Sequence, residues 1–70
     1  MYRRILRNAA HTRRFTITSS DASGWEVRDE QDSRLLRSRL YDDWHRVERA
    51  RLAFAMEAAG LRDEGWVETV

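Results

Sequence analysis

The stretch WEVRDEQDSRLLRSRLYDDW, from Trp25 to Trp44, decides the fold class because its periodicity changes along its length. Apolar Trp25 and Val27 alternate with charged residues, as in a strand with one buried face. Polar residues 30–33 (EQDS) predict a turn, and residues 34–41 (RLLRSRLY) alternate again. The stretch therefore predicts two antiparallel strands followed by a change to helical periodicity.

A third alternating segment, residues 12–18 (TRRFTIT), precedes this stretch, with Phe15 and Ile17 on one face. The polar residues 19–24 (SSDASG) predict the turn between the two segments. Together the segments predict a three-stranded antiparallel meander. The face that we expect to be covered carries Phe15, Ile17, Trp25, Val27, Leu36 and Leu40, opposite Trp44, Val47 and Phe54 of the helix.

The helix begins at DDW, where Asp42 or Asp43 caps it and suits the positive end of its dipole. Gly60 and Gly65 are both plausible C′ glycines, and we expect the helix to reach about Glu64. Residues 66–70 form a fourth strand or a tail. The apolar side of the helix carries Trp44, Val47, Phe54, Ala55, Ala58 and Leu61. The predicted fold class is α+β: a three-stranded antiparallel β-meander followed by one long amphipathic helix packed on one sheet face.

Seventy residues allow one domain, and we expect a single βββα domain over residues 12–70. Residues 1–11 would precede it as a basic N-terminal arm, which tracks phosphates, stays flexible, or forms a helical turn. The chain has no cysteine, so disulfides cannot supplement a small core. Self-association is the remaining way to bury more surface.

No apolar run approaches the roughly 20 residues that a membrane span needs, and no apolar segment follows the basic N-terminus. We therefore expect a cytoplasmic protein without membrane contact. The sequence offers no small-molecule substrate site and no cofactor motif.

The helix predicts an interface because its apolar arc is wider than the roughly 100° stripe that packing on one sheet face needs. One outer flank could pack on a protein partner, most economically a second copy of the chain, as a homodimer. The alternative is a helix sunk deeply into the core. The interface residues that we expect are Leu52, Ala55, Ala59, Glu48 and Arg51.

Arginines on the uncovered sheet face and in the arm suggest an alternative partner, DNA or RNA. Ion pairs between arginines and acids across an ordinary solvated sheet would explain the same pattern. The net charge is only +1, although the first fourteen residues contain arginines and no acid. The residues of this alternative are Arg3, Arg4, Arg7, Arg14, Arg28, Arg37 and Arg39.

Catalytic candidates are few. His45 shares helical spacing with Asp42 and Glu48, which is carboxylate–imidazole spacing, but no nucleophile or third metal ligand accompanies them. We predict no metal site and no enzymatic activity. The sequence thus favours a small, non-enzymatic binding or adaptor protein that acts through protein–protein contact, with nucleic-acid binding as the alternative.

Overall fold

Four strands are followed along the chain by one helix and then by a fifth strand, in the order ββββαβ. The computed structural model describes residues 2–20 and 24–69. The strands are β1 (Tyr2–Asn8), β2 (His11–Ser19), β3 (Trp25–Gln31), β4 (Arg34–Tyr41) and β5 (Val67–Thr69), and the helix is α1 (Trp44–Asp63). The α+β class is confirmed.

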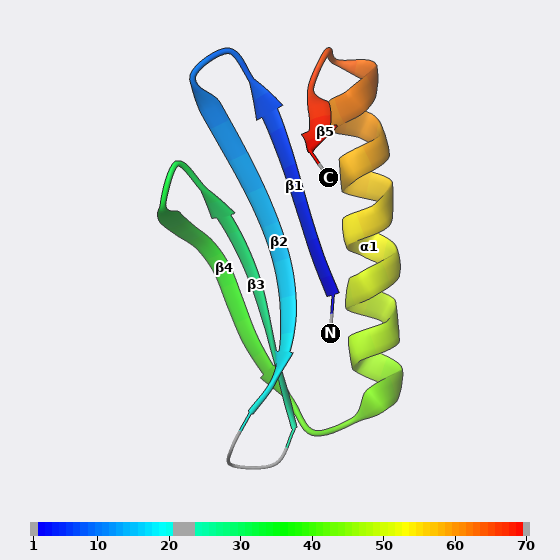
Figure 1. The fold of residues 1–70 in the computed structure, drawn as a ribbon. Coiled ribbons are helices and arrows are strands. Elements are labelled where there is room, and N and C mark those ends of the chain that lie inside the picture. Colours follow the sequence, from blue (N-terminus) through cyan, green and yellow to red (C-terminus); the bar gives the residue numbers. More distant parts are fainter. Residues whose placement is uncertain (1, 21–23, 70) are drawn as a thin grey trace.

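All strand pairs are antiparallel, in the spatial order β4-β3-β2-β1-β5. The three predicted strands correspond to β2, β3 and β4, and β1 extends this meander to four strands. The chain then passes through α1 from the β4 edge to the opposite edge, where β5 pairs with β1 (Figure 1). The three-stranded sheet was therefore too small a prediction.

Residues 1–11, expected as an arm, contain β1 instead. Tyr2–Asn8 pair with β2 over the whole strand, and Leu6 is fully buried. A tight turn at Ala9 and Ala10 joins the two strands, and Ala9 has a φ of 53°. Glycine and asparagine are the usual residues at such positive φ values, so two alanines carry no recognisable turn signal.

One face of the sheet forms the core together with α1. Phe15 and Ile17 of β2 and Val27 of β3 are buried in one cluster with α1, and the Phe15 and Phe54 rings lie 4.8 Å apart. Partly buried rings extend the cluster toward both edges of the sheet. The buried apolar residues are Leu6, Phe15, Ile17, Val27, Val47, Phe54 and Ala58.

The predicted orientation of β4 was wrong. Leu36 and Leu40 were expected on the covered face, but their exposed fractions are 47% and 63%. The register instead pairs Arg37 with the buried Asp29 and Arg39 with Val27, which places both arginines on the α1 side. An irregularity in the pairing lies between Asp29 and Glu30.

Trp44, also predicted to be covered, is about half exposed because it sits at the start of α1. Its ring meets Trp25 edge-on at 5.0 Å.

Local signals define both ends of α1. The Asp43 side chain accepts a hydrogen bond from the His45 N–H at 2.9 Å, as an N-cap does. At the other end, Gly65 has a φ of 102°, and the Trp66 N–H donates to the Leu61 carbonyl. This is a Schellman motif with Gly65 at C′, whereas Gly60 lies within the helix.

The two remaining turns differ. Asp32 and Ser33 both have positive φ, as a type I′ hairpin requires, which confirms the predicted turn between β3 and β4. The predicted turn at 19–24 falls partly on residues 21–23, outside the described residues; at its ends the Ser20 N–H donates to the Gly24 carbonyl. In the part of the chain that the structure describes, no helix combines the length and apolar character needed to cross a bilayer.

Candidate functional site

A buried ion cluster connects α1 to three strands. Asp29 of β3 is fully buried and accepts two hydrogen bonds from Arg13 of β2, at 2.8 and 2.9 Å. Arg37 of β4 donates to the same carboxylate at 2.6 Å and also to Glu57 of α1 at 2.8 Å. Burial by itself raises the pKa of Asp29, but the hydrogen bonds from both arginines outweigh it, so the pKa lies below its ordinary value. The charges of this cluster balance, which suits a structural role.

The ion cluster and a second pair remove cations from the predicted nucleic-acid surface. Arg37 is engaged by Asp29 and Glu57, and Arg4 donates two hydrogen bonds to Glu68 of β5, at 2.8 and 2.6 Å. The pair with Glu68 raises the pKa of Arg4 and lowers that of Glu68. Neither arginine lies on the uncovered face, because their register partners are the buried Asp29 and Phe15.

Four other arginines of the predicted set share the sheet face opposite α1. Arg3 and Arg28 flank Thr16 in one cross-strand row, and Arg14 lies next to Ile5 and Glu30 in the adjacent row. Because β1 is part of the sheet, it adds two cations to this face. Acids interrupt the face, and the Arg28 guanidinium lies 4.0 Å from Glu30. The four are Arg3, Arg7, Arg14 and Arg28.

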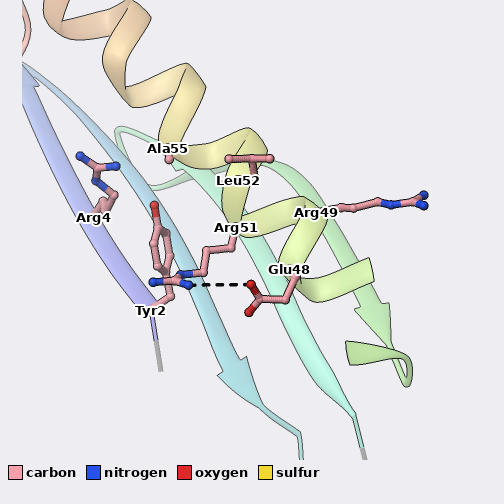
Figure 2. Close-up of a pocket in the computed structure, with 7 residues that line it drawn as sticks. All are labelled: Tyr2, Arg4, Glu48, Arg49, Arg51, Leu52 and Ala55. Carbon is pink, nitrogen blue, oxygen red and sulfur yellow. Dashed lines mark ion pairs between the residues drawn. The ribbon is translucent and has the colours of Figure 1, made fainter. Parts of the chain in front are cut away.

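The predicted protein interface lies beside β1. A groove of about 470 Å³ runs between one flank of α1 and the first residues of β1. Glu48, Arg51, Leu52 and Ala55, four of the five predicted interface residues, line it. Figure 2 shows the Arg51 side chain extending to Tyr2 of β1, with Glu48 beside it, while Arg49 extends away from both. Ala59, the fifth, lines a neighbouring hollow of the surface.

Two residues of β1 complete the groove: Tyr2, which the sequence analysis did not single out, and Arg4, which it assigned to the nucleic-acid surface. The Tyr2 ring stacks on Phe54 with centroids 6.3 Å apart, and the Arg51 guanidinium lies 5.8 Å above the Tyr2 ring (Figure 2). Arg4 lines the same groove. If residues 2–8 had been recognised as a strand, its alternation would have placed Tyr2 and Arg4 on the covered side. That alternation was the only sequence signal for these two residues.

Two large apolar side chains are exposed on the outer side of α1. Leu52 and Met56 have exposed fractions of 64% and 68%. Glu48 and Arg51 are separated by 3.9 Å, so they form a weak pair on the same helix. The groove therefore combines the apolar side chains of Tyr2, Leu52 and Ala55 with charged groups around them, which is an arrangement suited to macromolecular contact.

The histidines form no catalytic constellation. Asp42, His45 and Glu48 are all exposed, and the hydrogen bond at His45 comes from its backbone N–H to Asp43. His11 and Asp32 form an exposed pair at 2.7 Å, which helps to lower the pKa of Asp32. Within residues 2–20 and 24–69, no group of three or more side chains is arranged to hold a metal ion.

Comparison of the chain with protein-family models, curated proteins and solved structures found no match.

Proposed function

We propose that the chain is a small, non-enzymatic binding protein that self-associates through the outer flank of α1. The observation that carries this proposal is the groove between α1 and β1, where Leu52 is largely exposed next to Ala55 and Tyr2. Burying such apolar side chains against a partner is favourable by about 25 cal/mol per Å² of apolar surface. A chain of this length also gains most from an added interface.

The spacing along the flank suits a second copy of the chain. Glu48, Leu52, Ala55, Ala59 and Arg62 recur at intervals of four and three residues, which places them in one stripe along α1. The small side chains in the middle of the stripe allow two helices to approach closely.

An antiparallel pairing also satisfies the charges at the ends of the stripe. If Ala55 lies on the two-fold axis, Glu48 meets Arg62 of the partner subunit, because the two residues are equally distant from Ala55 in the sequence. The same contact occurs twice by symmetry.

The test is the mass in solution, measured by light scattering over a concentration series. We expect a dimer for the natural chain and a monomer for Leu52→Glu. Ala53→Glu is the matched control, because Ala53 is exposed outside the stripe. Glu48→Arg should weaken the dimer, and adding Arg62→Glu should restore it. A natural chain that stays monomeric at about 100 µM, well above micromolar affinities, would refute the proposal.

The cations of the uncovered sheet face favour a second candidate function, nucleic-acid binding. Arg3, Arg7, Arg14 and Arg28 project from a face without a covering helix, alongside threonines that can donate to phosphates. Glu26 lies on this face together with Glu30, which weakens the attraction. We rank this function second for that reason.

Fluorescence anisotropy of labelled single-stranded and duplex DNA separates the two functions. Binding that weakens steeply with salt, and is lost in Arg14→Glu, would support the sheet face. Arg49→Glu, on the exposed side of α1, is the control with the same charge change. Equal affinity in both variants would exclude the sheet face as a specific binding surface.

A further inference from the structure

The strand β4 forms one edge of the sheet, and among residues 2–20 and 24–69 its only neighbouring strand is β3. It is 8 residues long, and every residue from Arg34 to Leu40 is exposed. An edge of this length presents a row of backbone N–H and C=O groups that can pair with another extended chain. Figure 1 shows β4 at the opposite side of the sheet from β1 and β5.

The two sides of this edge have different chemistry. Arg37 and Arg39 point to the α1 side, because their register partners are Asp29 and Val27, both buried there. Ser38 and Leu40 point to the uncovered side, and Leu40 is 63% exposed. A strand added beside β4 would therefore meet cations on one side and neutral or apolar groups on the other.

This charge pattern disfavours a second copy of β4 as the added strand. Arg34, Arg37 and Arg39 are the charged residues of β4, and the strand contains no acid. Pairing two β4 strands would bring arginines together on the same side of the sheet, and like charges directly opposite each other are destabilising. The edge thus discourages self-pairing by its charges.

The contacts between β4 and its neighbour β3 show which side chains complement the charges of β4. Asp29 of β3 lies opposite Arg37 and binds it at 2.6 Å, while Ser38 donates to Glu26 across the strands at 3.4 Å. Arg37 also reaches Glu57, so it accommodates two carboxylates at once. The side chains of β4 therefore bind carboxylates within the fold.

We propose that the free edge of β4 binds an extended segment of a partner protein in which acidic residues alternate with apolar ones. The acids lie on the α1 side against Arg34 and Arg39, whose register partners Gln31 and Val27 are uncharged, whereas Arg37 is already paired with Asp29 and Glu57. The apolar residues lie beside Leu40 on the other side. Backbone hydrogen bonds along β4 supply the pairing, and the charge pattern supplies the selection. This site is separate from the α1 flank because β4 and β1 lie at opposite sides of the sheet.

The probe is a capped eight-residue peptide that alternates glutamate and valine, added to the chain carrying Leu52→Glu so that dimerisation cannot contribute. We expect saturable binding, with slowed amide hydrogen exchange in β4 and unchanged exchange in β1. The matching lysine–valine peptide should bind at least roughly tenfold more weakly, since its cations oppose the arginines. A glutamate–valine peptide methylated on alternate backbone nitrogens should not bind, because it cannot form the strand pairing.

A pair of variants locates the charge effect. Arg39→Glu should reduce affinity for the glutamate–valine peptide by roughly tenfold and improve binding of the lysine–valine peptide. Arg49→Glu, at an exposed position of α1 beside the groove next to β1, carries the same charge change and should leave both affinities unaltered. Equal binding of both peptides, exchange protection outside β4, or a Leu52→Glu chain that dimerises through β4 would each overturn the proposal.

Discussion

Replacing Asp29 by asparagine tests whether the buried ion cluster holds α1 to the sheet. Asparagine keeps the size of the side chain but removes the charge that compensates Arg13. The Arg13 side chain is only 17% exposed, so it would remain as a mostly buried cation whose remaining carboxylate partner is Glu57, at 3.6 Å. Removing one partner of a buried pair in this way costs about 3–5 kcal/mol of unfolding free energy.

That loss is large for a chain of 70 residues. At 0.05–0.15 kcal/mol per residue, its total stability is on the order of 4–10 kcal/mol. Arg37→Gln should cost only about 1 kcal/mol, because the Arg37 side chain is 54% exposed and Asp29 keeps both hydrogen bonds from Arg13.

Urea unfolding followed by tryptophan fluorescence, at one fixed protein concentration, measures both changes. Asp42→Asn is the control, because Asp42 is exposed and the N-cap is Asp43; it should change stability by less than about 0.5 kcal/mol. If Asp29→Asn lost no more than Arg37→Gln, the reasoning from burial would be refuted.

The same variant has a defined pH dependence. The pKa of Asp29 is lower in the folded state than its ordinary value of 3.8, so its contribution is complete above that value. The contribution is lost as the pH falls through the lowered folded-state pKa. The stability difference between the natural chain and Asp29→Asn should therefore shrink below about pH 4, and unfolding curves at neutral and acidic pH measure it.

The remaining predictions concern turns and the helix and its cap, and the same unfolding experiment measures them. Ala9→Gly should stabilise the chain by about 1 kcal/mol, since Ala9 has a φ of 53°, whereas Ala10→Gly should not, since its φ is not positive. Gly24→Ala should destabilise strongly because a Cβ there would lie 2.5 Å from the Tyr41 carbonyl oxygen; Gly60→Ala meets no atom within 4 Å and should stabilise α1 by about 0.5–1 kcal/mol. Asp43→Ala should cost about 1 kcal/mol through the lost N-cap, and a loss near zero would contradict the capping assignment.

The candidate interface was predictable in part. Helical spacing alone identified Leu52 and Ala55 as members of one flank, since a helix fixes which residues share a side. Tyr2 and Arg4 were missed because their contribution depends on β1 joining the sheet. The arginines were assigned to one surface too broadly, because the register of each strand decides which side a residue faces.

The sequence by itself determined the features that rest on short-range chemistry: the alternation of β2 and β3, the turn at Asp32, and two candidate caps at each end of α1, of which the structure uses Asp43 and Gly65. These depend on neighbouring residues and on backbone preferences that act within one turn or strand. The tertiary structure alone decided that β1 joins the sheet, since its partners lie in β2 and at the far end of the chain.

The tertiary structure also decided which side chains of β4 face α1. The sequence pattern predicted Leu36 and Leu40 on the face covered by α1. Arg37 lies on that face instead and pairs with the buried Asp29, because a charge that is removed from water must be paired. Edge position leaves Leu40 exposed at the same time, beyond the reach of the core. Local pattern therefore defined β2, β3, β4 and α1, whereas long-range pairing of charges and strands decided the place of β1 and which residues reach the surface.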